Sequence, residues 1–261
     1  MPGSGERSEP RILSAVTAAE VEAFLKSLPF SMDRAGFLRF ALGFPRRYLE
    51  TTPPTEVVRH YALMESLGGR AVISSIAREE DVWKLSIVAR DRRALFSRIA
   101  GALSCFGMNI VAAEAFANAS SLILDTFRFA DWNDAFRDAG ERRRFQVFLE
   151  DVVEGKADVE AELAKHPEAA SLQKGPLTLA WSDAAHLGAT RLAVGGRDRF
   201  ALLYRLSRAI SDAGLDIEMA YIDTSGEEVV DEFFLTREGA RLTADEQSRL
   251  DARLRALAAS G

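Results

Sequence analysis

The chain carries one sequence pattern twice: residues 84–129 read KLSIVARDRRALFSRIAGALSCFGMNIVAAEAFANASSLILDTFRF, and residues 191–235 read RLAVGGRDRFALLYRLSRAISDAGLDIEMAYIDTSGEEVVDEFFL. Moving one copy by 107 positions, the step from Asp91 to Asp198, aligns identical residues in both. The matching residues are Arg90, Asp91, Arg92, Ala94, Leu95, Arg98, Gly107, Ile110 and Ala113 with Arg197, Asp198, Arg199, Ala201, Leu202, Arg205, Gly214, Ile217 and Ala220. The repeat therefore predicts two modules of one kind.

Length and composition suit two small globular domains. The chain has 261 residues, 48% of them hydrophobic and 28% charged, which is enough apolar material for two cores. The net charge of -6 argues against general binding of nucleic acid, because phosphate recognition requires clustered Lys and Arg. The basic run Arg142–Arg144 is interpreted as a solvated helix face, and no nucleic-acid partner is expected.

Cysteine content and hydropathy bear on the compartment. The single cysteine, Cys105, excludes an internal disulfide and a cysteine-based metal cluster. No apolar run approaches the roughly 20 residues needed to cross a bilayer, and residues 1–10 are polar, unlike the apolar segment of a signal peptide. We expect a cytoplasmic protein with no membrane partner.

Each copy follows the order strand, helix, hairpin, helix. In the first copy a strand over 85–89 precedes a helix that opens at Asp91, keeps apolar residues at Leu95, Ile99 and Leu103, and ends at Gly107. Strands over 110–116 and 122–129 flank a turn, and a second helix runs from about 134 to 153. The second copy repeats the order, with strands over 192–195, 217–223 and 229–235 and helices over 202–213 and about 243–259.

This order is one strand short of the ferredoxin-like β-α-β-β-α-β sandwich. The missing strand is expected upstream, at residues 71–76 for the first copy and 177–181 for the second, where each would form a hairpin with the next strand. The predicted fold class is therefore α+β: two tandem ferredoxin-like sandwiches with a permuted β-β-α-β-β-α order, preceded by a short helical segment.

Proline and linker patterns divide the chain further. Helices are expected over 18–28, 34–42 and 55–66, separated by Pro45 and by the pair Pro53 and Pro54. The predicted organisation is an N-terminal tail and helical segment over residues 1–68, a first module over 69–155, a linker over 156–175 and a second module over 176–261.

Residues with catalytic chemistry are sparse. The three histidines, His60, His166 and His186, are far apart in sequence, and none has the spacing of a metal site. The sequence has no phosphate-binding glycine loop of the Walker type and no G-x-S-x-G motif. We therefore expect no catalytic residue, no metal ligand and no cofactor. An enzyme of unrecognised type is the third and weakest functional interpretation.

The turn before each first helix is the remaining candidate for chemistry. Asp91 and Asp198 are interpreted as caps that accept hydrogen bonds from the first helical turn. A helix N-terminus beside a sheet edge also offers N–H donors to the carboxylate of a small ligand. Asn109 and Asp216, just after the helix-ending glycines, are expected close to these turns, although ordinary turn chemistry is the alternative explanation for both.

These residues resemble a known family. The pattern Asp-Arg-x-Ala-Leu, then a helix, Gly-x-Asn/Asp-Ile and a closing Val/Leu-Asp-x-Phe is similar to the ACT domain, a ferredoxin-like regulatory module that binds amino acids. Two modules at this spacing, preceded by Phe44–Leu49 and Pro53–His60, resemble the C-terminal regulatory region of bacterial PII uridylyltransferase/uridylyl-removing enzymes, over about residues 40–260.

The resemblance implies a sensor of a small amino acid, glutamine first among candidates, linked to nitrogen or amino-acid metabolism. The motifs of that family's catalytic halves, a Gly-Ser followed by Asp-x-Asp and a His-Asp pair, are absent from this sequence. Ala94 and Ala201 stand where the family has glycine, which lets a ligand approach the backbone. Asp216 replaces the usual asparagine and adds a negative charge, so the first turn is expected to be the better site.

The resulting expectation is a non-enzymatic regulatory protein that forms a homodimer through sheet edges or helices. The alternative is a structural or interaction module whose pockets are degenerate. The expected ligand-binding residues are Asp91, Arg92, Ala94, Leu95, Asn109 and Ile110 in the first copy and Asp198, Arg199, Ala201, Leu202, Asp216 and Ile217 in the second.

Overall fold

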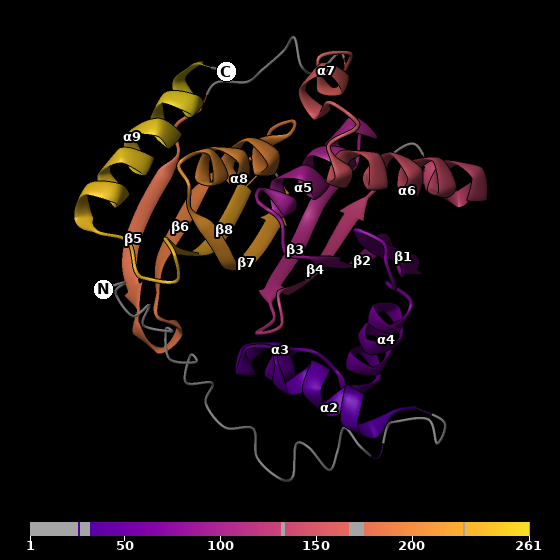
Figure 1. Cartoon of the computed structure of the whole chain (residues 1–261). Helices are drawn as coiled ribbons and strands as arrows, with labels where there is room; N and C mark the ends of the chain where they lie inside the picture. Colours follow the sequence, from indigo (N-terminus) through magenta and orange to yellow (C-terminus); the bar gives the residue numbers. More distant parts are fainter. Residues whose placement is uncertain (1–25, 27–31, 132–133, 167–174, 227, 261) are drawn as a thin grey trace, which may run out of the picture. The chain divides into compact units, whose positions relative to one another are not determined.

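The computed structural model describes residues 26, 32–131, 134–166, 175–226 and 228–260 (Figure 1). The chain divides into two compact units, residues 1–61 and 62–261. The second unit contains both sequence repeats, and the finer boundaries expected at 69–155 and 176–261 stay predictions. No helix in the described part of the chain combines the length and the apolar character needed to cross a membrane.

The first unit is built from short helices around aromatic side chains. Its helices are α2 (Arg34–Leu42), α3 (Arg46–Thr51) and the beginning of α4 (Pro54–Glu65). The helix predicted over 34–42 is confirmed, and Asp33 caps it by accepting a hydrogen bond from the amide of Ala35. Helix α3 was not predicted, and the helix expected over 18–28 lies, apart from Lys26, outside the described residues.

Buried rings hold this unit together. Phe37 and Phe40 both contact Tyr61, and Phe44 lies between Phe40 and Tyr48, with ring centroids 4.7–5.5 Å apart. The hydroxyl of Tyr48 shares a 3.0 Å hydrogen bond with Nδ1 of His60. These contacts explain why the apolar residues of the Phe44–Leu49 stretch fold inward although two arginines interrupt it.

The two repeats share the order β-β-α-β-β-α, and short helical elements are added at different places in each. The first contains β1 (Val72–Glu79), β2 (Val82–Arg90), α5 (Leu95–Cys105), β3 (Asn109–Ala117), β4 (Leu122–Ala130), the 3-10 turn η1 (Ala135–Arg137), α6 (Ala139–Glu154) and α7 (Val159–Leu163). The second contains β5 (Thr178–Ala184), the 3-10 turn η3 (Ala185–Leu187), β6 (Ala189–Arg197), α8 (Leu202–Asp212), β7 (Asp216–Ser225), β8 (Glu228–Thr236) and α9 (Ala244–Ser260).

The predicted permutation is confirmed. Strand β1 pairs antiparallel with β2, and β5 pairs antiparallel with β6, in register over their whole length. Each leading strand therefore occupies the sheet edge that the last strand fills in the usual ferredoxin-like order. Gly107 and Gly214 end the first helix of their repeats in the left-handed conformation, with φ of 69° and 74°, as expected for C-terminal glycines.

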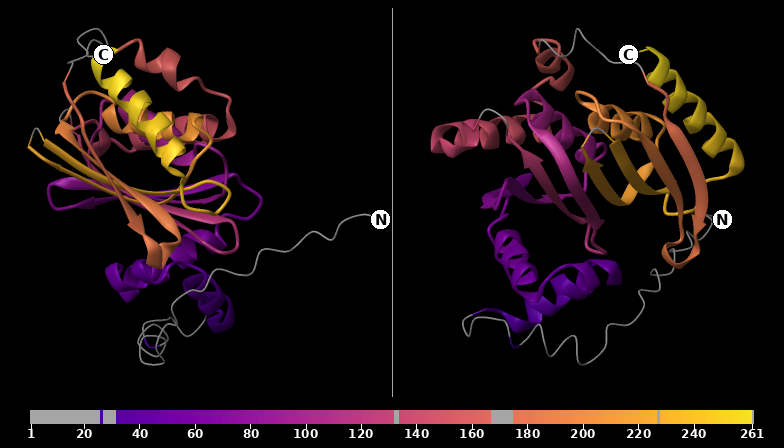
Figure 2. Two further views of the ribbon diagram at one scale, coloured as in Figure 1. Left: turned by 90° about the vertical axis from the view of Figure 1, so that its left-hand side faces the viewer. Right: turned by 180° about the vertical axis from the view of Figure 1, so that it is seen from behind.

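The eight strands of the described residues form one antiparallel sheet with the order β1-β2-β4-β3-β7-β8-β6-β5. The repeats join where β3 pairs with β7, so that Ala115 lies opposite Ala220. Helices α5, α6, α8 and α9 cover one face of this sheet (Figure 2). The edge-to-edge pairing expected between subunits is thus made within one chain, and a homodimer stays a prediction.

The core lies between this sheet face and the helices. Alternate residues of the central strands, such as Leu85, Ile87 and Phe127, are fully buried there, as the period of two in a strand requires. Helices α5 and α8 pack side by side above the β3–β7 junction (Figure 1). They approach closely because Gly101 has no side chain: a Cβ there would lie 2.8 Å from the ring of Tyr204.

Candidate functional site

The turns before α5 and α8 differ from the predicted capped helix starts. The helices begin at Leu95 and Leu202, several residues after the aspartates, and the residues at their N-caps, Ala94 and Ala201, have φ of 62° and 56° and no capping side chain. The capping role predicted for Asp91 and Asp198 is therefore wrong. Asp198 instead accepts a 2.8 Å hydrogen bond from the amide of the adjacent Arg199.

The positive φ suits the glycine that the ACT pattern has at these positions. Glycine adopts the left-handed region without strain, whereas alanine carries a Cβ that makes it less favourable. Here both alanines keep the conformation. The amide of Leu202 donates to the carbonyl oxygen of Arg199. Since no side chain among the described residues caps α8, the later N–H groups of its first turn stay available to an outside acceptor.

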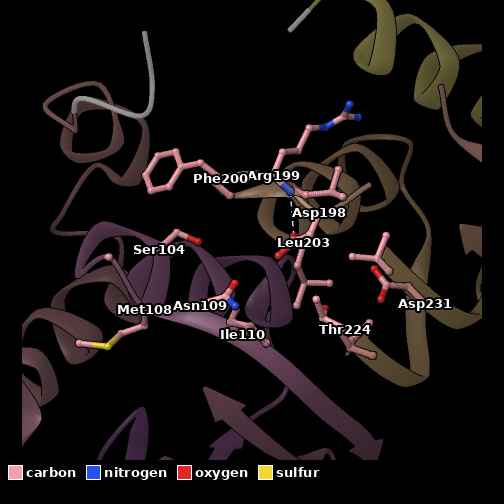
Figure 3. Close-up of a pocket in the computed structure, with 15 residues that line it drawn as sticks. Ser104, Met108, Asn109, Ile110, Asp198, Arg199, Phe200, Leu203, Thr224 and Asp231 are labelled. Carbon is pink, nitrogen blue, oxygen red and sulfur yellow. Dashed lines mark hydrogen bonds between the residues drawn. The ribbon is translucent and has the colours of Figure 1, made fainter. Parts of the chain in front are cut away.

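A cavity of about 170 Å³ lies at the second of these turns, between the two repeats. The first repeat contributes the end of α5 and the start of β3, and the second contributes the turn before α8 and parts of β7 and β8 (Figure 3). Its lining consists of Ser104, Gly107, Met108, Asn109, Ile110, Asp198, Arg199, Phe200, Ala201, Leu202, Leu203, Ile222, Thr224, Val229 and Asp231.

The cavity brings together residues that the sequence analysis had assigned to different sites. Asn109 and Ile110 of the first repeat line it with the Asp198 turn of the second. The side-by-side sheet causes this exchange, because β3 and β7 are neighbours and each begins next to the other repeat's turn. Binding at either turn stays a prediction. The remaining expected site residues, Asp91, Arg92, Ala94, Leu95, Asp216 and Ile217, do not line this cavity.

The first turn has different surroundings. Arg93, which stands where the second repeat has Phe200, reaches the other repeat and donates a 3.1 Å hydrogen bond to the carbonyl oxygen of Ser211. Ser211 is the counterpart of Ser104 in the cavity lining. Asp91 is exposed, and desolvation of its carboxyl together with the charge of Glu218 raises its pKa. The cavity lies at the second turn, and the expectation that the first turn is the better site stays a prediction.

Two acids belong to the cavity. Asp198 is half-buried, and desolvation raises its pKa. Asp231, on β8, is 1% exposed, and its Oδ1 has no hydrogen-bond partner among the described residues. Burial raises the pKa of Asp231 to about 7, and the negative charges of Asp198 and Asp223 add to this effect, while a hydrogen bond from the backbone amide of Asp223 opposes it.

Asp231 was missed as a site residue. Its signal in the sequence was a charged residue at an inward position of a strand, between Val229 and Phe233, which face the core. Asp125 holds the matching place in the first repeat, since it lies opposite Ile87 as Asp231 lies opposite Val194. The Asp125 carboxyl is fully buried, and neither oxygen has a partner in the described residues.

The site offers recognition chemistry. Within the described ranges, no group of three or more His, Cys, Asp and Glu side chains is arranged to hold a metal ion. Burial raises the pKa of the nearby Cys105 thiol to about 12, which keeps it in the weakly nucleophilic thiol form at neutral pH. The cavity lining combines the turn before α8, Asn109, Arg199 and the two acids, a set suited to a small ligand that carries both charges.

Comparison with known proteins finds similar sequences in one kind of bacterial enzyme. No family model matches the chain. It is 31% identical over 228 residues to the bifunctional uridylyltransferase/uridylyl-removing enzyme of Azospirillum brasilense, an alignment that covers 82% of this chain and 24% of that enzyme. It is 32% identical over 195 residues to the enzyme of the same name from Caulobacter vibrioides, covering 72% of this chain and 20% of the relative.

The chain therefore spans about a quarter or less of the length of the curated relatives that it matches. Among solved structures, aspartate kinase from Synechocystis aligns with a TM-score of 0.39 and 16% identity, over 69% of this chain and 27% of that one. The chain is thus similar to one part of the bifunctional enzyme, as its sequence motifs indicated.

Proposed function

We propose that this chain is a non-catalytic regulatory module that binds a small amino acid in the cavity between its repeats, with glutamine as the first candidate. One observation carries the proposal: the cavity joins an uncapped helix N-terminus to Asn109 of the other repeat and to two acids. The similarity to a part of the uridylyltransferase/uridylyl-removing enzymes supports a regulatory role in nitrogen or amino-acid metabolism in the cytoplasm.

The chemistry of the lining matches the two ends of an amino acid. The N-terminal turn of α8 suits the carboxylate, because free N–H groups and the helix dipole both favour negative charge. Asp198 and Asp231 suit the ammonium group. A volume of about 170 Å³ is below the ~300–1,000 Å³ of sites for drug-sized ligands, which selects an occupant of metabolite size.

Regulation follows from the position of the cavity between the repeats. A ligand that touches Asn109 and the Asp198 turn at once stabilises the arrangement in which α5, α8 and the β3–β7 pair are closely packed. Ligand binding shifts a conformational equilibrium by its difference in affinity for the two states. The amino acid would therefore report its concentration through the packing of one repeat on the other.

Thermal denaturation with each of the twenty amino acids tests this proposal. An amino acid at 100 times its Kd adds about 2.7 kcal/mol to the stability, which corresponds to a rise of about 5–10 °C for a unit of this size. In Asn109→Ala, at least ten times more ligand should be needed for the same rise in melting temperature. Glu150→Ala, at an exposed position of α6 outside the cavity, is the control and should respond like the wild type.

The rival function is a structural or interaction module with degenerate pockets. Ala94 and Ala201 favour it, because each puts a methyl group on the turn where a ligand would meet the backbone. This function predicts no change in melting temperature with any amino acid up to about 10 mM, on the order of the weakest binding useful to a sensor. That result would overturn the binding proposal.

A further inference from the structure

Asp231 is a cavity residue with an oxygen that the described residues leave without a hydrogen-bond partner. Asp231 is 1% exposed, lines the cavity, and leaves Oδ1 without a partner among the described residues. A buried carboxylate without a matching donor is costly, and proteins keep such groups mainly at functional sites. Asp125 shows the same unpaired state away from the cavity, so it is the position of Asp231 on the cavity that makes its free oxygen a candidate ligand contact.

We infer that Asp231 is the specificity-determining residue that receives the ammonium group of the bound amino acid. This inference rests on the proposed function and narrows the ligand to a primary ammonium compound. An ammonium group supplies three N–H donors and a positive charge, which would satisfy the oxygen that the described residues leave unpaired. Asp198, at the turn on the same cavity, provides a second acceptor.

The charges around Asp231 support a cationic partner. Two charged groups act on it in the described structure, Asp198 from the turn before α8 and Asp223 from β7, and both are acids. The Asp231 carboxyl accepts a hydrogen bond from the backbone amide of Asp223, but its Oδ1 has no partner among the described residues. A cation in the cavity would relieve the repulsion among these acids, whereas a neutral or acylated nitrogen would not.

A dependence of affinity on pH follows. With a pKa of about 7, Asp231 is mostly protonated at pH 6 and mostly charged at pH 8. Since the charged form receives the ammonium group, the apparent affinity is expected to fall about tenfold from pH 8 to pH 6. Binding at pH 7 should also release protons, because the cation favours the charged carboxylate.

The first repeat provides a matched control. Asp125 occupies the same place on β4, is equally buried and has both oxygens unpaired among the described residues, but it does not line the cavity. Asp125→Asn removes the same kind of buried acid without touching the ligand. Asp231→Asn keeps the shape of the side chain and removes its charge.

Titration calorimetry of the whole chain tests the inference, using each of the twenty L-amino acids and the N-acetyl form of every one that binds. Asp231→Asn should weaken binding roughly 10- to 100-fold and abolish the pH dependence between pH 6 and 8. N-acetylation should weaken binding to the wild type by a similar factor, while Asp125→Asn should bind like the wild type. Buffers of different ionisation heat should reveal proton release.

The outcomes separate this inference from the proposed function. Suppose that the wild type binds an amino acid, that Asp231→Asn binds it equally tightly, and that the wild type binds the N-acetyl form equally tightly. The proposed function then stands, and the role of Asp231 is overturned. If Asp125→Asn weakens binding as much as Asp231→Asn, the effect is a general one on the fold, and the inference is again overturned. If no amino acid binds the wild type, both proposals fail.

Discussion

Asp231→Asn is expected to stabilise the second repeat at pH 8 and to change its stability little at pH 4. The Asp231 side chain is 1% exposed, and burial raises its pKa from 3.8 to about 7. In the unfolded chain the carboxyl returns to a pKa near ~3.9. Asparagine has nearly the same shape and carries no charge at any pH, so the variant isolates the effect of ionisation.

The direction of the pH effect follows from proton binding. Between about pH 4 and pH 7 the folded wild type keeps a proton that the unfolded chain has lost, so its free energy of unfolding falls as the pH rises. A change from 3.8 to about 7 spans about 3 pH units, and each unit corresponds to about 1.4 kcal/mol. Above pH 7 the variant should therefore exceed the wild type by up to about 4 kcal/mol.

Urea unfolding at pH 5, 6, 7 and 8 measures this difference. Fluorescence of Trp83 and Trp181, which lie on β2 and β5, reports on the sheet. Glu150→Gln, at an exposed position of α6, controls for the loss of one surface charge and should show no comparable trend. The stability difference could instead be equal at pH 5 and pH 8, or the wild type could become more stable relative to the variant as the pH rises. Either result would show that folding does not raise the pKa of Asp231.

Two further predictions concern the backbone. Ala201→Gly should raise the urea midpoint by the equivalent of about 0.5–1 kcal/mol, because glycine accepts the φ of 56° without strain; an unchanged or lower midpoint would show that the turn is unstrained. Gly101→Leu should cost about 1–3 kcal/mol, since even a Cβ would lie 2.8 Å from Tyr204. Gly69→Ala, where a Cβ would have no neighbour within 4 Å, should be nearly neutral, and equal losses in both variants would contradict the packing argument.

The repeat predicted most of the fold. Alternating apolar residues such as Leu85 and Ile87 mark strands by themselves, and the spacing of the two Asp-Arg turns fixes the equivalent elements of the second copy. The permuted strand is also predictable from the sequence, because each repeat needs a fourth strand and only one apolar run precedes it at the right distance. These features depend on local sequence and on the chain order.

The helix starts were mispredicted for a local reason. Aspartate before a helical pattern is a common capping residue, and alanine is the best helix former. Neither preference indicates that Ala94 and Ala201 adopt a positive φ and delay the helix. The glycine of the ACT pattern at these positions is the signal, since glycine takes a left-handed conformation without strain.

The cavity depends on a contact that the sequence of one repeat does not contain. Asn109 meets the Asp198 turn because β3 pairs with β7. The same strand edge could equally pair between two chains, and the pattern of either repeat is identical in both cases. Asp231, in contrast, could be identified from the sequence. It is a charged residue between inward-facing Val229 and Phe233, where the alternation of the strand calls for an apolar residue.

NMR titration of the isotopically labelled chain shows whether an amino acid binds between the repeats. Signals of the Asn109 side-chain amide and of the Ala201 backbone amide should shift together with glutamine or another amino acid, and both should give the same Kd. The Ala94 amide, at the corresponding turn of the first repeat, should shift much less. Absence of any shift at Asn109 and Ala201, or saturable shifts confined to one repeat, would exclude an amino-acid site between the repeats.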